Sequence, residues 1–157
     1  MSGNNNNNEP QMPHISPEAF IARWQDVTAS ELSTSQSFII DLCVLLGVPW
    51  PYATPEQDYM LERPVTFTYA DGTTSAGRVD CYQRGKFVAE SKKQKAAVGS
   101  ERFSRTLIEA HAQGDGYIRA LPAPEGRPPF LLVLDIGTVI DGLFRVQSQR
   151  RHIHSFP

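Results

Sequence analysis

Apolar residues recur with helical spacing in three parts of the chain. A serine cap, a proline and a glutamate begin the first, which predicts a helix from Pro17 to about Asp26. The second is predicted from Glu31 to Leu46, where Gly47 supplies the residue that commonly ends a helix. A third helix is predicted from about Ser100 to Ala112. In the sequence, the first two helices precede and the third follows a central region whose apolar residues have the spacing of strands.

Strand signals fill the central region and return near the C-terminus. We predict five strands from alternating or continuous apolar runs: Val65–Tyr69, Arg78–Gln83, Phe87–Lys92, Phe130–Leu134 and Leu143–Val146. Asp71-Gly72 and Arg84-Gly85-Lys86 supply the turns between the first three. The order of helices, three strands, a helix and two strands predicts an α/β fold.

Length and composition indicate one domain with an ordinary core. The chain has 157 residues, of which 40% are apolar and 20% charged, with a formal net charge of -2. This balance excludes a globally basic nucleic-acid coat but allows a local basic groove. The two cysteines, Cys43 and Cys81, lie in apolar surroundings and are expected to be reduced core residues.

The chain begins with a polar, asparagine-rich stretch. We expect residues 1–15 to be a disordered leader and residues 16–157 to form the domain. No apolar run approaches the roughly 18 residues of a membrane span, and the polar start does not resemble a signal peptide. These features predict a cytoplasmic protein that does not associate with membranes.

The strongest chemical signal is the hairpin over residues 78–92. If the turn is centred on Gly85, residues whose numbers sum to 170 face each other, so Asp80 lies opposite Glu90 with Cβ atoms about 5 Å apart. Two carboxylates so close repel each other unless a divalent cation lies between them, and Mg²⁺ suits such a pair. Lys92 shares the face of Glu90 because strand side chains alternate. The set predicts phosphodiester hydrolysis.

These residues resemble the signature of the restriction-endonuclease-like, or PD-(D/E)xK, nucleases, with Val79 in place of the proline. The resemblance implies a mixed central sheet flanked by helices. It also implies that Asp80, Glu90 and the Ser91 carbonyl bind Mg²⁺, with Mn²⁺ able to substitute, and that Lys92 is the catalytic lysine. Related nucleases add a glutamate from the preceding helix, which makes Glu31 a candidate ligand, although a first-turn acid on a helix is common without any such role.

Supporting positions are proposed from the same resemblance. Gln113 and Tyr117 match the QxxxY form of the RecB-like branch, in which both residues support the site or the DNA backbone. Alternatively, Gln113 caps a helix that Gly114 and Gly116 break, and Tyr117 is a core aromatic residue. Asp41, which lies between apolar residues of the second helix, is a further candidate for support.

Four basic residues flank the hairpin acids and are candidate DNA-phosphate contacts: Arg84, Lys86, Lys93 and Lys95. Lysines in turns and at strand ends are commonly only solvated, so both interpretations stay open.

Several spaced segments together resemble the N-terminal nuclease region of MmeI-like type IIG/IIL restriction-modification enzymes. They are residues 17–24, 35–49, the hairpin and residues 127–137, and the resemblance covers residues 17–157. It implies Mg²⁺-dependent cleavage of double-stranded DNA in defence against phage. Methyltransferase and target-recognition domains of a longer protein would be partners, and two active sites, hence dimerisation, would be needed to cut both strands. The alternatives are an inactive DNA-binding or partner-docking module of this fold, and a structural domain with solvent-facing acids.

Overall fold

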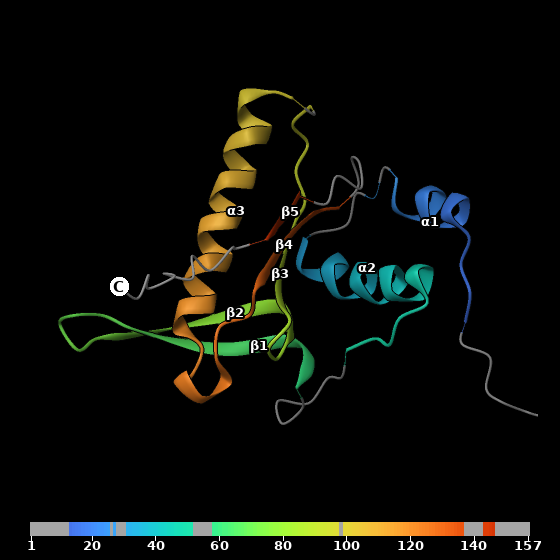
Figure 1. Ribbon diagram of the computed structural model, residues 1–157. Helices are drawn as coiled ribbons and strands as arrows, with labels where there is room; N and C mark the ends of the chain where they lie inside the picture. Colours follow the sequence, from blue (N-terminus) through green and yellow to red (C-terminus); the bar gives the residue numbers. More distant parts are fainter. Residues whose placement is uncertain are drawn as a thin grey trace, which may run out of the picture.

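The computed structural model describes residues 13–25, 27, 31–51, 58–97, 99–136 and 143–146, with only the backbone at 31–33 and 143–146 (Figure 1). Most of the predicted leader, residues 1–15, therefore lies outside the described residues, as do residues 147–157 of the predicted domain. Within the described part, three α-helices and five strands are present.

The order of the elements follows the predicted α/β pattern. The helices are α1 (Pro17–Trp24), α2 (Glu31–Leu46) and α3 (Glu101–Ala120), and the short 3-10 helix η1 (Ala123–Glu125) follows α3. The strands are β1 (Tyr59–Thr68), β2 (Thr74–Gln83), β3 (Phe87–Lys92), β4 (Phe130–Asp135) and β5 (Leu143–Val146). The strands lie in the order β1-β2-β3-β4-β5, and β3 pairs parallel with β4 while the other pairs are antiparallel. The fold is therefore a mixed sheet flanked by helices, as expected.

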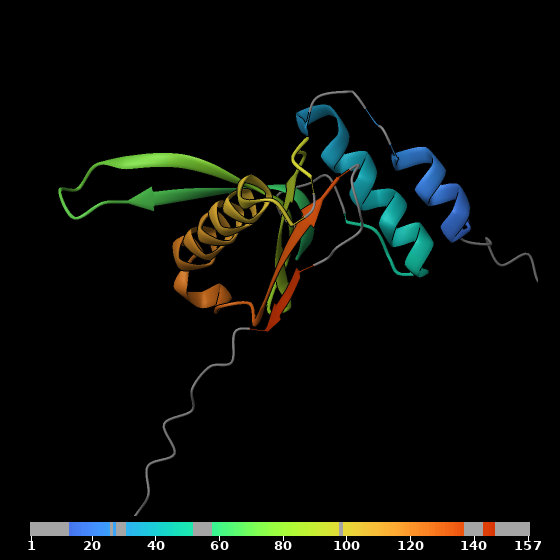
Figure 2. The same ribbon diagram turned by 90° about the horizontal axis from the view of Figure 1, so that it is seen from above.

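The sheet buries a separate apolar cluster on each face. Figure 2 shows α1 and α2 on one side of the strands and α3 on the other. Residues of α1 and α2 cover one face and meet strand residues such as Cys81 and Ala89. On the other face, α3 packs against residues that include Tyr82 and Val88. Cys43 and Cys81 are both free and buried, which confirms that they are reduced core residues. The hairpin β2–β3 is thus supported from both sides.

Beyond the sheet, β1 and β2 continue as a long two-stranded projection, residues 63–79, called here the arm (Figures 1 and 2). Both strands are longer than predicted, because only their apolar parts show strand periodicity. Cys81 and Val79 lie two residues apart on β2 yet belong to the clusters on opposite faces. A regular strand would place them on one face, so the alternation reverses at Asp80. Opposite this point, Glu62 has a positive φ of 55°.

Helix α3 is longer than the sequence suggested. The sequence predicts its end at about Ala112, with Gly114 and Gly116 as helix breakers in one interpretation, but the helix continues to Ala120. A Cβ atom at Gly114 would lie 2.4 Å from Cδ1 of Leu131, so this glycine lets α3 approach β4 closely. Tertiary packing here outweighs the low helix propensity of glycine.

Candidate active site

The hairpin register matches the prediction as far as the strands pair. Cys81, Tyr82 and Gln83 face Ala89, Val88 and Phe87, so paired numbers sum to 170. Pairing stops one step before Asp80 and Glu90 would meet. Asp80 Oδ2 instead accepts hydrogen bonds from the backbone N–H of Ser91 at 2.7 Å and from its hydroxyl at 2.5 Å. The carboxylate of Asp80 is therefore fixed against the β3 backbone directly beside Glu90.

Glu90 lies inside the protein, with 1% of its surface exposed. Its neighbour two residues earlier, Val88, belongs to the α3-side cluster, and alternation directs Glu90 and Lys92 to that same face. Burial of a carboxylate away from water is costly unless other groups compensate its charge. Its burial in a strand that otherwise buries mainly apolar groups keeps Glu90 a candidate for the predicted site.

Lys92 is connected to α3 by two hydrogen bonds in series. Its Nζ donates to Oε1 of Gln113 at 3.0 Å, and Nε2 of Gln113 donates to the hydroxyl of Tyr117 at 2.9 Å. Gln113 and Tyr117 are four residues apart and so lie on one face of α3. Gln113 therefore contacts the lysine side chain directly, and Tyr117 contacts Gln113. The functional role of both residues stays a prediction.

The direction of the strand carbonyls bears on Ser91. The carbonyls of Lys86 and Lys92 accept hydrogen bonds from β4 and its continuation, at Phe130 and Ile136. Since successive carbonyls of a strand point to opposite sides, the carbonyl of Ser91 points away from β4, toward the β2 side where Asp80 lies. This arrangement is compatible with the predicted part of Ser91 in metal binding.

The two predicted acids of α2 have different surroundings. Asp41 Oδ2 accepts a hydrogen bond from Nε1 of Trp24 at 3.0 Å and forms an ion pair with Arg23 at 3.1 Å. It thereby joins α1 to α2 and makes no contact with the hairpin acids. Glu31 is the first residue of α2, and its side chain lies outside the described part. Both views show that the N-terminal end of α2 is the end nearest the sheet (Figures 1 and 2).

The four basic candidates separate into two groups. Arg84 and Lys86 lie in the turn before β3, whereas Lys93 and Lys95 follow its C-terminal end, next to Glu90 and Lys92. Six strand residues span about 20 Å, so these groups do not form one cluster. Lys95 is exposed and Lys93 partly exposed. Only the second group is placed to meet a phosphate bound near the acids.

Asp135, at the C-terminal end of β4, is not among the site residues predicted from the sequence. It pairs in register with Lys92 and is buried, with 3% of its surface exposed. Burial raises the pKa of this carboxyl, and the nearby backbone amide and side chain of Gln94 act in the opposite direction. The available signal was an acid at the end of an apolar run, but its proximity to Lys92 depends on the parallel pairing of β3 with β4.

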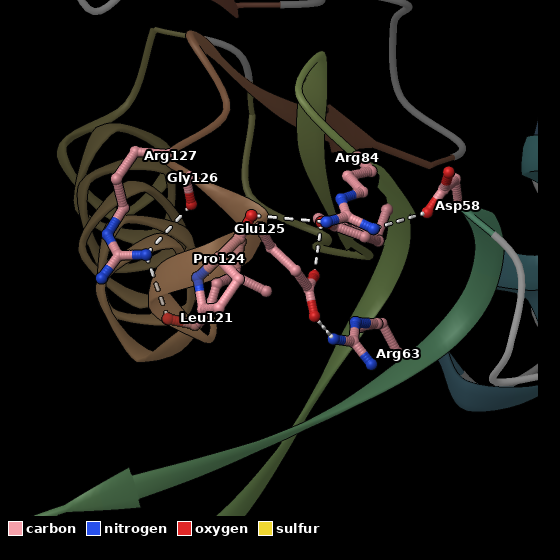
Figure 3. Close-up of polar contacts among 9 residues, drawn as sticks. Asp58, Arg63, Arg84, Leu121, Pro124, Glu125, Gly126 and Arg127 are labelled. Atoms are coloured by element: carbon pink, nitrogen blue, oxygen red, sulfur yellow. Dashed lines mark hydrogen bonds and ion pairs between the residues drawn. The ribbon is translucent and has the colours of Figure 1, made fainter.

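A second polar cluster, also missed, lies at the turn end of the hairpin (Figure 3). Glu125 of η1 forms an ion pair with Arg63 and accepts a hydrogen bond from the hydroxyl of Tyr82 at 2.6 Å. Arg84 donates to the carbonyl of Pro124 and to Asp58, both at 3.3 Å. We call these residues the Glu125 cluster. Burial and the bond to Glu125 raise the pKa of Tyr82.

The described residues limit what a metal site can contain. Among the side chains that the structure places, no group of three or more histidine, cysteine, aspartate or glutamate residues could hold a metal ion. The candidate donors at the hairpin are two carboxylates and one backbone carbonyl. The helices described here include none that is long and apolar enough to span a membrane.

The fold and the hairpin together define a class: α/β domains that carry two acids and a lysine on the central hairpin of a mixed sheet. Residues 13–142 match the family described as MmeI, N-terminal domain, and the chain belongs to this family. No curated protein and no solved structure matches the chain. The family indicates a module of a restriction-modification enzyme, within a larger protein that acts on DNA.

Proposed function

We propose that this domain is the Mg²⁺-dependent DNA endonuclease module of such an enzyme and hydrolyses phosphodiester bonds. The observation that carries the proposal is the placement of Asp80, Glu90 and Lys92 at the open end of one hairpin, with Asp80 held against Ser91. A cut in both strands of a duplex requires two such sites, so we expect two copies of the domain to act together.

The donor set suits a hard divalent cation. Asp80 and Glu90 provide carboxylate oxygens, and the Ser91 carbonyl points to the same side as Asp80. Mg²⁺ favours oxygen ligands and commonly binds through one or two carboxylates plus waters and substrate phosphate, so the absence of a third described carboxylate is no obstacle. When bound, the cation would polarise the scissile phosphate and lower the pKa of a water molecule. Glu31 and Mn²⁺ remain parts of this proposal.

Besides the charge of the cation, the site contains a positive charge from the protein, the ammonium of Lys92. Its ammonium has three donors, and the amide oxygen of Gln113 accepts one hydrogen bond from it. We propose that this ammonium orients a water molecule and stabilises negative charge that develops on the phosphate. Lys93 and Lys95 follow directly, and we propose that they contact the DNA backbone. Arg84 and Lys86 are expected to contribute less, because they lie at the other end of β3.

Two measurements together test the proposal. Supercoiled and linear DNA are incubated with the protein and Mg²⁺ or Mn²⁺, and Mn²⁺ binding is measured separately by calorimetry. Asp80→Ala and Lys92→Ala are compared with Lys86→Ala, which removes the same type of charge at the far end of the hairpin. We expect cleavage by the parent and Lys86→Ala only, and Mn²⁺ binding to be lost in Asp80→Ala but kept in Lys92→Ala.

Other outcomes distinguish the alternatives. DNA binding without cleavage, and without any Mn²⁺ site that depends on Asp80, would support the inactive DNA-binding module. Mn²⁺ binding that depends on Asp80 without cleavage would support the metal site and show that cleavage needs the other domains. An Asp80→Ala variant that keeps both cleavage activity and Mn²⁺ binding would refute the site.

A further inference from the structure

The arm touches the residues that hold Lys92. The ring of Phe67 in β1 lies against the ring of Tyr117, with centroids 5.6 Å apart and planes at 34°. Across the arm, Gly77 of β2 lies so close that a Cβ atom would be 2.6 Å from Cε2 of Phe67 and 2.7 Å from Cε1 of Tyr117. The Tyr117 ring therefore lies in a slot formed by both strands of the arm.

Tyr117 in turn connects this slot to the hairpin. The residue is buried, with 7% of its surface exposed, and its hydroxyl accepts the hydrogen bond from Gln113 that orients the glutamine toward Lys92. Every link in this series is a direct contact between neighbouring groups. The series starts at the base of the arm and ends at the lysine ammonium.

We infer that Phe67 and Gly77 are positioning residues, which set the location of the Lys92 ammonium through Tyr117 and Gln113. This inference rests on the proposed function of Lys92. A lysine has a flexible four-carbon stem, so its backbone position alone does not fix its charged end. The arm contributes a constraint on that end by fixing the ring to which the glutamine is bonded. A displacement of the arm is then transmitted to the site.

Gly77→Ala is the sharpest perturbation, because the added methyl group must displace the Tyr117 or Phe67 ring. Misplacement of a catalytic group by about 1 Å can lower a rate by on the order of 100-fold. We expect kcat for Mg²⁺-dependent cleavage to fall by about 10- to 100-fold, with DNA affinity and Mn²⁺ binding unchanged. Gln113→Ala, which breaks the series beyond the arm, should lower kcat to a similar degree.

Gly116→Ala provides a matched control. Its Cβ would meet the same Phe67 ring, at Cε1, but at an ordinary contact distance of 3.7 Å. Alanine is also preferred to glycine inside a helix. This variant should keep the parental kcat. If Gly77→Ala fails to fold, Phe67→Leu removes the stacked ring without overpacking and is expected to lower kcat in the same direction.

A readout independent of cleavage separates this inference from the proposed function. The rate at which an amine-specific acylating reagent modifies Lys92 is followed by peptide mass spectrometry. Modification should be faster in Gly77→Ala and Gln113→Ala than in the parent, and unchanged in Gly116→Ala. A parent without cleavage but with this pattern would support the coupling, while the nuclease itself is judged separately by Mn²⁺ binding that depends on Asp80. Folded Gly77→Ala and Phe67→Leu proteins with parental kcat and parental modification would overturn the coupling.

Discussion

The two ends of the β2–β3 hairpin hold acidic side chains in different ways. At the turn end, Glu125 is largely enclosed and meets the guanidinium of Arg63 together with the hydroxyl of Tyr82. At the open end, Asp80 is held by the neutral N–H and O–H groups of Ser91, and no basic side chain among the described residues forms an ion pair with it. One acid is matched by a charge of the protein, and the other is not.

This difference distinguishes the packing role of Glu125 from the binding role that we propose for Asp80. A carboxylate with its own arginine has satisfied its charge, so the Glu125 cluster fastens η1 to β1 and β2. Neutral donors fix the position of Asp80 while leaving its negative charge to interact with something outside the chain. Changes in the first cluster should therefore affect mainly stability, and changes at the second mainly function.

Glu125→Gln should produce the largest loss of stability. Removal of one partner of an enclosed ion pair leaves Arg63 with an uncompensated charge, which costs about 3 kcal/mol of unfolding free energy. Urea denaturation measures the difference. Asp58→Asn is the control, since this pair with Arg84 has an Asp58 side chain that is 75% exposed and should change stability by less than about 0.5 kcal/mol. Equal effects of the two substitutions would contradict the assignment.

Tyr82→Phe tests the second partner of Glu125. The lost hydroxyl donates to a charged acceptor, and such hydrogen bonds contribute about 2 kcal/mol. Chemical denaturation should show this loss, while Mn²⁺ binding at the hairpin should stay at the parental level. A weakened metal site in a fully folded variant would indicate that the two ends of the hairpin are not independent.

Asp80→Asn should have a smaller effect on stability, about 1 kcal/mol, because an amide retains one oxygen acceptor for the Ser91 donors. Its effect on function should be far larger, with metal-dependent cleavage lost. Melting temperature and plasmid cleavage measured on the same preparation give both values. A variant that melts far below the parent would place Asp80 among the structural acids.

Asp135 should make stability depend on pH in the direction opposite to an ion-paired acid. Burial raises its pKa in the folded state above the ordinary value of 3.8, so the folded protein holds this proton more tightly than the unfolded chain. The resulting stabilisation is present below about pH 3.8 and is lost as pH rises through the higher folded value. Asp135→Asn should raise stability at neutral pH and reduce this slope, which denaturation at several pH values would reveal.

Local sequence signals predicted much of the fold. Residue patterns alone placed α2, β3 and β5 at their observed bounds and α1 within two residues, because caps, turns and periodicity are properties of neighbouring residues. The strand Val65–Tyr69 and the turn Asp71-Gly72, both within the arm, were also predicted, but the full lengths of β1 and β2 and the end of α3 were not. Residues 59–64 and 74–77, which extend the predicted strands, lack a regular apolar alternation, and α3 packs at Gly114 against Leu131, which is distant in sequence.

The candidate site likewise contains features that neighbouring residues determine and features that depend on contacts between distant parts of the chain. The register from Gln83–Phe87 to Cys81–Ala89 follows from one short turn and could be predicted, whereas the bonding of Asp80 to Ser91 beyond it could not. The Glu125 cluster and Asp135 depend on a crossover through α3 and η1, which no local pattern specifies. Asp41 shows the converse, because its contact with Trp24 explains its position between apolar residues without any role at the hairpin.

The three-residue turn at Arg84-Gly85-Lys86 makes the separation of the two acids a fixed length. Each acid lies a set number of strand residues from Gln83 or Phe87, the last paired residues before the turn. One residue inserted into either strand would rotate an acid to the opposite face. A longer or shorter hairpin therefore keeps both acids together only if residues are added or removed in matched pairs, one on each strand.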